Sequence, residues 1–85
     1  MPKITVYSKA YCPYCQAAKA LLTRKGATFE EIDVTYDPEG QRAMARRAGG
    51  RSTVPQIFIG ETHVGGYAEL AGLERAGRLD ALLGS

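Results

Sequence analysis

The sequence has no tryptophan, one histidine and only two cysteines among its 85 residues. So few cysteines exclude the disulfide framework that stabilises many small secreted domains. Cys12 and Cys15 lie three positions apart, so a disulfide between them would close a very short loop and would stabilise the fold little. We therefore expect the pair to have a chemical role, in catalysis or in metal binding.

An excess of one charge sign is also missing, because 11 Lys and Arg stand against 9 Asp and Glu. This balance does not indicate a surface for nucleic acid or for a membrane. No apolar run approaches the roughly 20 residues that a membrane span needs. The first residues, Met1 to Tyr7, lack the apolar stretch of a signal peptide. We expect a single domain over residues 1–85 that is a cytoplasmic monomer, in a compartment where thiols stay reduced.

A metal site is not expected either. Structural zinc usually takes four ligands, and besides the two sulfurs the chain offers only His63 and scattered carboxylates. We interpret His63 as a surface residue of a strand.

The plainest alternative for the two cysteines is that Cys15 is a small buried apolar residue and Cys12 an incidental loop thiol. Their position in the predicted fold argues against that alternative.

Hydrophobic patterning predicts four strands, over residues 4–7, 28–34, 57–59 and 62–64. The alternation in the second strand is imperfect, because Phe29 falls on the opposite face from Ile32 and Val34. The third strand is a continuous apolar run, which is typical of a strand covered on both faces. Gly60 and Glu61 form the turn into the fourth.

Helices are predicted between these strands. One begins at Pro13 and stops at Gly26, and a second begins after the N-cap Asp37 and ends at Gly49-Gly50. The leucines after Gly65-Gly66 predict one helix, or two short ones separated near Gly77. The order is β-α-β-α-β-β-α, an α/β fold. A right-handed crossover makes the first two strands parallel, so we expect a four-stranded mixed sheet flanked by helices on both faces.

Cys12 and Cys15 lie where a strand, a loop and a helix meet. If Pro13 is the first helical residue, Cys12 is the N-cap, where free backbone N–H groups and the helix dipole stabilise a sulfur anion. Lys9 adds a positive charge in the same loop. Cys15 follows one helical turn later, close to the Cys12 sulfur but turned toward the protein. This arrangement predicts disulfide exchange in which Cys12 attacks and Cys15 resolves the mixed disulfide.

With Cys12-Pro13-Tyr14-Cys15 in place, the chain resembles the glutaredoxins of the short bacterial dithiol type nearly from end to end. Thr53-Val54-Pro55 and Gly65-Gly66 stand where that family carries Thr-Val-Pro and Gly-Gly, and Lys9 matches its basic residue before the motif. The resemblance implies a thioredoxin fold in which Pro55 is cis and lies against the cysteines. It also implies glutathione as reductant and co-substrate, no permanently bound cofactor, and disulfide-containing or glutathionylated proteins as partners.

The resemblance further implies a binding site for glutathione. A sharp turn at Pro55 would expose the backbone of Val54 to this extended peptide, and Lys9 and Arg42 would bind a carboxylate. Tyr14 would flank the cysteine of glutathione, and the N–H groups after Gly65-Gly66 would bind the γ-glutamyl carboxylate. From composition alone, Arg42, Arg46 and Arg47 form a solvated helix face. The residues expected to contact glutathione are Lys9, Tyr14, Arg42, Thr53, Val54, Pro55, Gly66, Tyr67 and Ala68.

One position departs from the family pattern. Its members commonly follow Gly-Gly with a small residue and then Asp, whose carboxylate receives the amine of glutathione, whereas this chain has Tyr67-Ala68-Glu69. Ala68 has no charge. Glu69 is a candidate to supply the carboxylate from one position later, but its side chain leaves the helix in a direction about 100° away. Weaker or altered selectivity for glutathione is the expected consequence.

Two other functions stay open on this evidence. The chain could be a redoxin that thioredoxin reductase recycles, which Ala68 favours and which Lys9 and Arg42 oppose. It could also be a carrier in which Cys12 and glutathione hold an iron–sulfur cluster between two protomers. Cys15 opposes the carrier function, because it offers Cys12 an internal disulfide partner.

Overall fold

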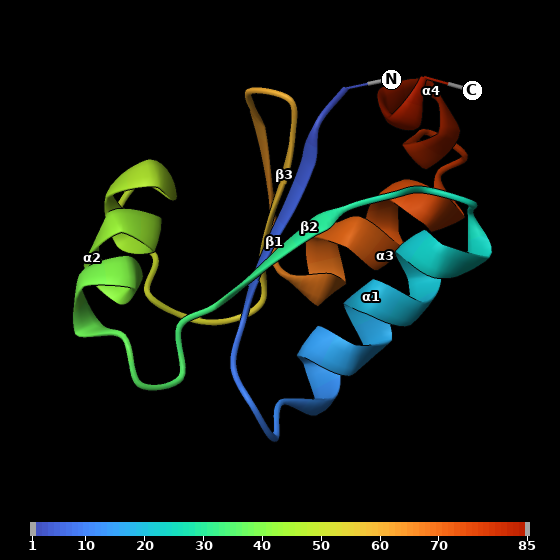
Figure 1. The fold of residues 1–85 in the computed structure, drawn as a ribbon. Coiled ribbons are helices and arrows are strands. Elements are labelled where there is room, and N and C mark those ends of the chain that lie inside the picture. The colour runs from blue at the N-terminus through green and yellow to red at the C-terminus, as the bar shows by residue number, and fades with distance from the viewer. Residues whose placement is uncertain (1, 85) are drawn as a thin grey trace.

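The computed structural model describes residues 2–84, which form a four-stranded sheet with helices on both faces (Figure 1). The elements are, in chain order, β1 (Ile4–Ser8), α1 (Pro13–Arg24), β2 (Glu30–Asp33), α2 (Pro38–Arg47), β3 (Gln56–Ile59), β4 (Thr62–Gly65), α3 (Tyr67–Arg75) and α4 (Leu79–Leu83). The predicted order of strands and helices is confirmed, with the last helical region divided in two.

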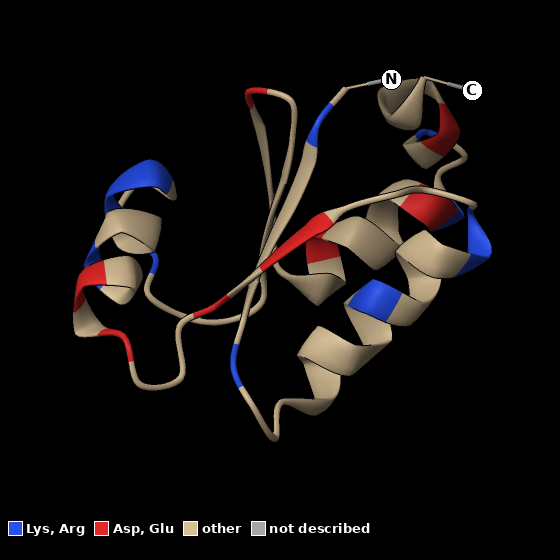
Figure 2. Ribbon diagram, in the orientation of Figure 1, with Lys and Arg blue, Asp and Glu red and all other residues tan. Residues whose placement is uncertain are grey.

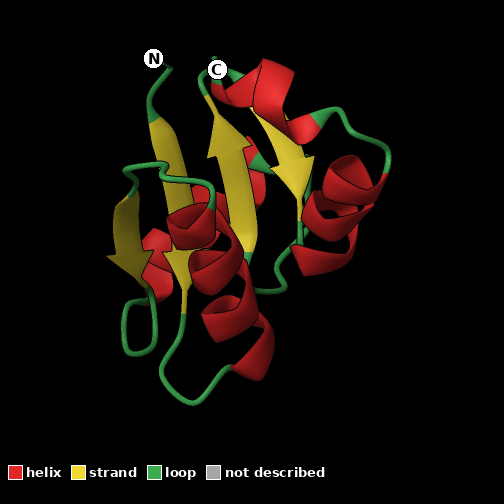
Figure 3. Cartoon of the chain, turned by 90° about the vertical axis from the view of Figure 1, so that its right-hand side faces the viewer, coloured by secondary structure: helices red, strands yellow, loops and turns green. Residues whose placement is uncertain are grey.

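The strands lie in the order β2-β1-β3-β4. Strand β1 pairs in parallel with β2 and antiparallel with β3, and β3 pairs antiparallel with β4 across the turn at Gly60. The register between β3 and β4 shifts at Ile57 and Phe58. A second view shows the sheet between the helices (Figure 3). The mixed sheet expected from the crossover and the tight turn is confirmed.

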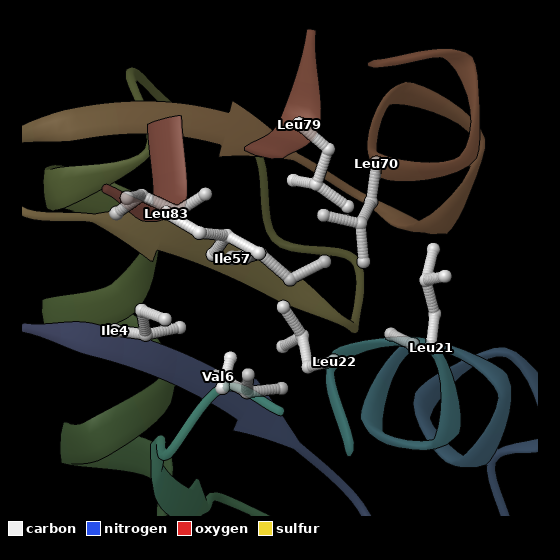
Figure 4. Packing of buried hydrophobic residues seen from close by; sticks show 11 residues of the cluster. Ile4, Val6, Leu21, Leu22, Ile57, Leu70, Leu79 and Leu83 are labelled. Atoms are coloured by element: carbon white, nitrogen blue, oxygen red, sulfur yellow. The ribbon is translucent and has the colours of Figure 1, made fainter. Parts of the chain in front are cut away.

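Two hydrophobic clusters hold the helices against the sheet. On one face, Ile4, Val6 and Ile57 of the central strands meet leucines of α1, α3 and α4 (Figure 4). On the other face, Tyr7 and Phe58 pack against α2 (Figure 1). Every residue of β1 and β3 is buried, because helices cover both faces of the two central strands.

Strand β2 is shorter than the predicted segment 28–34. Its ladder ends where Asp33 pairs with Ser8, because β1 ends there. The imperfect alternation has a simple cause. Phe29 packs against the cluster under α1, whereas Ile32 and Val34 pack against the cluster under α2, so both faces of this segment take part in a core. The charged residues of the strand are exposed.

Gly77 separates α3 from α4. Its φ of 72° lies in the left-handed region, where glycine has no steric penalty. Its N–H donates to the carbonyl of Glu74 at 3.0 Å, and the N–H of Arg78 donates to that of Leu73 at 2.9 Å. These two bonds close the end of α3 and turn the chain into α4. Of the two readings left open for this region, two short helices is the observed one.

Charged residues of both signs occur in many parts of the fold (Figure 2). The last turn of α2 carries Arg46 and Arg47, which interact favourably with the negative end of that helix dipole. Asp37 caps the other end of α2, where its Oδ1 accepts the N–H of Gly40 at 2.9 Å. Within residues 2–84, no helix is long and apolar enough to cross a membrane.

Candidate active site

Cys12 is the N-cap of α1, as predicted. Its backbone is extended, with φ −109° and ψ 104°, and Pro13 begins the helix. The Sγ atom of Cys12 accepts the backbone N–H of Cys15 at 3.2 Å. The sulfur therefore takes the place of the oxygen that usually caps a helix, at the positive end of the helix dipole. Cys12 is partly exposed, so a substrate sulfur can reach it.

Tyr11 gives the chain its direction into this helix. Its φ of 60° makes it the one residue other than glycine with a positive φ in the part of the chain described. A side chain in this conformation is unfavourable by about 1–2 kcal/mol. The tyrosine ring itself is almost fully exposed, so it contributes little packing in return. No sequence pattern indicates this conformation.

Cys15 is completely buried at the first turn of α1. Burial and a hydrogen bond with Cys12 raise the pKa of its thiol to about 11, although a backbone hydrogen bond from Lys9 and the charge of Lys19 act in the opposite direction. Cys15 is therefore protonated at neutral pH and screened from solvent. The sulfur of Cys12 is partly exposed to solvent and that of Cys15 is buried. This difference fits a Cys12 that reacts with the substrate and a Cys15 that reacts only with Cys12.

The loop before β3 lies against Cys12. The peptide bond between Val54 and Pro55 is cis, as the resemblance implies. The Sγ atom of Cys12 lies 3.9 Å from the carbonyl oxygen of Val54, to which its thiol donates. Gln56 stabilises this loop, because its Nε2 donates to the carbonyl and the hydroxyl of Thr53 at 3.0 and 3.2 Å.

His63 supports this loop indirectly and is not the surface residue that the sequence predicts. It lies on β4, but it is half-buried, because its ring stacks on Phe58 with 4.9 Å between centroids. Its Nε2 lies 2.7 Å from Oε1 of Gln56. Among residues 2–84, no three His, Cys, Asp or Glu side chains are grouped so that they could hold a metal ion.

A groove of about 270 Å³ lies beside the cis-proline loop and the start of α3. Seven of the residues predicted to contact glutathione line it: Tyr14, Thr53, Val54, Pro55, Gly66, Tyr67 and Ala68. The rings of Tyr14 and Tyr67 stack at one side with centroids 6.1 Å apart. Segments far apart in the sequence thus meet at a single groove near Cys12.

Arg51 and Glu69 also line the groove. Oε1 of Glu69 accepts the N–H of Gly66 at 2.6 Å and lies 3.3 Å from Nη1 of Arg51. The bond from Gly66 is the main cause that lowers the pKa of Glu69, and Arg51 adds to it. Gly65 makes room for this arrangement: its φ is 116°, and a Cβ there would lie 2.6 Å from Oε1 of Glu69.

Arg51 could not be predicted from the sequence, because a lone arginine in a loop forms no pattern. From the sequence, Glu69 is a possible substitute for the carboxylate missing at Ala68; in the structure its carboxylate binds the N–H of Gly66 and the guanidinium of Arg51.

The structure does not bring Lys9 and Arg42 to this groove. Arg42 lines a separate, larger hollow of about 570 Å³ beside Tyr36, and its guanidinium lies 3.7 Å from Glu39. Lys9 is half-buried directly after β1 and contributes its backbone N–H to Cys15. Lys9 thus lies in the loop before Cys12 and Arg42 lies on α2, and neither lines the groove.

Comparisons with known proteins decide what this site belongs to. Residues 4–64 match the family described as Glutaredoxin. A glutaredoxin of Pseudomonas aeruginosa is 58% identical over 83 residues, which cover 98% of each chain. The chain belongs to the glutaredoxin family. Its short length and the near-complete overlap with this bacterial relative make it a short bacterial glutaredoxin, as the motifs predicted.

Solved glutaredoxin structures agree with the fold. The solution structure of a Brucella melitensis glutaredoxin has a TM-score of 0.86 and 53% identity, and the match covers 98% of this chain and 89% of that one. The crystal structure of a buckwheat glutaredoxin–glutathione complex has the same TM-score at 34% identity, covering 96% of this chain and 76% of that one. The thioredoxin fold is thereby confirmed. As a glutaredoxin, the chain is a thiol–disulfide oxidoreductase.

Proposed function

We propose that this glutaredoxin uses glutathione to reduce protein disulfides and glutathione mixed disulfides, with Cys12 as nucleophile and Cys15 as resolving thiol. The observation that carries the proposal is the groove beside Cys12, which gathers seven residues predicted from sequence to contact glutathione. The buckwheat relative of the same fold has been solved in complex with glutathione. Glutathione serves as a co-substrate that comes and goes, and not as a resident cofactor.

The first step is an attack by the Cys12 thiolate on a substrate disulfide. A bond forms between Sγ of Cys12 and one substrate sulfur, and the other substrate sulfur leaves as a thiolate. The N–H of Cys15 donates to Sγ of Cys12, which lies at the positive end of the α1 dipole. When the substrate is a glutathione mixed disulfide, the glutathione stays on Cys12 and a second glutathione releases it as glutathione disulfide.

The groove has the groups that an extended peptide with a terminal carboxylate needs. Val54 offers backbone groups at the cis-proline turn, and the N–H groups of Tyr67 and Ala68 open α3. Arg51 adds a guanidinium at the same end of the groove. Lys9 and Arg42 do not line the groove. They are the proposed partners of the glycine carboxylate of glutathione, and their side chains must turn toward Cys12 to bind it.

Ala68→Asp is expected to lower the Michaelis constant for glutathione by about threefold to tenfold, because Ala68 lines the groove where the family carries a carboxylate. A new carboxylate there would receive the ammonium group of glutathione, a charge-assisted contact of about 1 kcal/mol or more. Steady-state kinetics with varied glutathione measure the effect. Ala68→Asn is the matched control, with the same shape and no charge. Equal constants for wild type and Ala68→Asp would contradict a role for this position.

The electron donor is tested directly by comparing two reducing systems. Wild-type protein is expected to reduce a mixed disulfide of glutathione and a small thiol rapidly with glutathione and glutathione reductase, and slowly with thioredoxin reductase. The absence of a carboxylate at Ala68 is the observation that favours thioredoxin reductase. Fast reduction by that enzyme together with none by glutathione would establish the second function in place of the first.

A further inference from the structure

A small cluster of polar side chains lies beside Cys15 and outside the groove. Nζ of Lys19 is 2.7 Å from Oε2 of Glu31, and the hydroxyl of Ser8 donates to the same oxygen at 2.6 Å. The side chain of Lys19 is 21% exposed and that of Glu31 40%. Ser8 is fully buried. The mechanism above uses none of these three residues.

The cluster approaches Cys15 from the helix and from the sheet. Lys19 follows Cys15 by four positions in α1, so the two side chains share one face of the helix. Ser8 directly precedes Lys9, whose backbone N–H bonds to the sulfur of Cys15. Glu31 is paired with Val6 in the ladder, and Val6 faces the α1 side of the sheet. Lys19 therefore sits one helical turn from a buried thiol and is paired with Glu31 of β2, which Ser8 of β1 holds in turn.

The resolving step needs this thiol to lose its proton in a buried place, where a bare thiolate is unfavourable. We propose that Lys19, held in position by Glu31 and Ser8, is a positioning residue that stabilises the thiolate of Cys15 when it attacks the mixed disulfide. The proposal rests on the roles assigned above to Cys12 and Cys15. It gives the cluster a part in the exchange of protein disulfides.

The step balances without any further reagent. The thiol of Cys15 releases its proton to solvent, and the thiolate attacks Sγ of Cys12. The bond between Cys12 and the substrate sulfur breaks, and that sulfur leaves as a thiolate. The cysteine pair is oxidised by two electrons, and the substrate disulfide has been reduced by the same two.

The charged groups near Cys15 have opposite effects. On its own helix, Lys19 favours the Cys15 thiolate and a Cys12 thiolate opposes it. On β2, Glu31 neutralises part of the charge of Lys19, and Asp33 also interacts with Lys19. Lys19 and Ser8 lower the pKa of Glu31, so this carboxylate is ionised throughout the neutral range. Removing Lys19 and removing Glu31 should therefore shift the resolving step in opposite directions.

The test follows the reaction of the reduced full chain with 5,5′-dithiobis(2-nitrobenzoate). The attack of Cys12 on the reagent forms a mixed disulfide and releases one coloured thionitrobenzoate. The attack of Cys15 on that mixed disulfide releases the second. Lys19→Gln is expected to slow the second release about threefold to tenfold at pH 7 and to move its pH profile up by about half to one unit. Glu31→Gln should move the profile down. Lys19→Arg keeps the charge and should restore the wild-type profile.

Lys3→Gln is the matched control, because Lys3 forms a similar pair with Glu30 at 3.4 Å, close to the opposite end of β1. It should leave both releases unchanged. The proposal would be overturned if Lys19→Gln and Glu31→Gln moved the pH profile of the second release in the same direction, or if neither moved it. A pair with only a structural role would give the same effect whichever of its two residues is replaced. The assay contains no glutathione, so its outcome is independent of the donor test. A wild type with no second release would refute the role of Cys15 itself.

Discussion

Replacing Cys12 by serine is expected to reduce the exchange of every disulfide substrate to the rate measured without protein. A serine hydroxyl is not ionised near neutral pH and forms no mixed disulfide, so neither route can begin. Cys15 cannot substitute for it, because it is fully buried and its pKa is raised to about 11. Turnover of a glutathione mixed disulfide and of a protein disulfide, measured side by side, gives the result.

The fold should survive this change. Serine is a favoured N-cap residue, and its hydroxyl can accept the N–H of Cys15 that the sulfur accepts now. The free energy of unfolding in urea serves as the control and is expected to stay within about 1 kcal/mol of wild type. Substantial exchange in a well-folded Cys12→Ser protein would mean that another group is the nucleophile.

Replacing Cys15 by serine is expected to separate the two kinds of substrate. Reduction of a glutathione mixed disulfide needs only Cys12 and a second glutathione, so its rate should stay within a few-fold of wild type. Reduction of a protein disulfide by the dithiol route needs an internal thiol to expel the substrate from Cys12, and this activity should be largely lost. Initial rates with both substrates at one glutathione concentration measure the split.

The buried position of Cys15 calls for a second variant. A serine hydroxyl there loses its solvent partners, which costs about 1–3 kcal/mol if no new hydrogen bond forms. Cys15→Ala avoids that cost and should give the same division between substrates. If both variants lose the two activities in equal measure while remaining folded, Cys15 is not the resolving thiol.

Much of the fold could be predicted because its signals are local. Pro13 and Pro38, each behind a capping residue, begin helices where the sequence indicated, and the turn at Gly60 joins two antiparallel strands. The bounds of β2 could not be predicted, because the length of a ladder depends on its partner strand and β1 ends at Ser8. The left-handed backbone of Tyr11 had no signal either, since the surrounding fold imposes it.

In the candidate site, too, the residues with local signals could be predicted, and those that meet only in the folded chain could not. Residues inside contiguous motifs, such as Thr53-Val54-Pro55 and Gly66, could be assigned to one groove from the sequence. Arg51 and Glu69 meet only after the loop before β3 and the start of α3 come together, so their ion pair has no signature in either segment. Lys19 and Glu31 pair across a helix and a strand for the same reason.

The exposed edge of β2 has a consequence beyond the active site. Glu30, Glu31 and Asp33 place three carboxylates on a strand of four residues, along one border of the sheet. Backbone groups at such a border can pair with the same strand of another molecule and begin aggregation. Lys3 and Lys19 offset part of the charge of Glu30 and Glu31. Two copies approaching along β2 would still bring carboxylates against carboxylates, and like charges facing each other across strands are destabilising. The acidic strand thus opposes edge-to-edge association of the protein at high concentration.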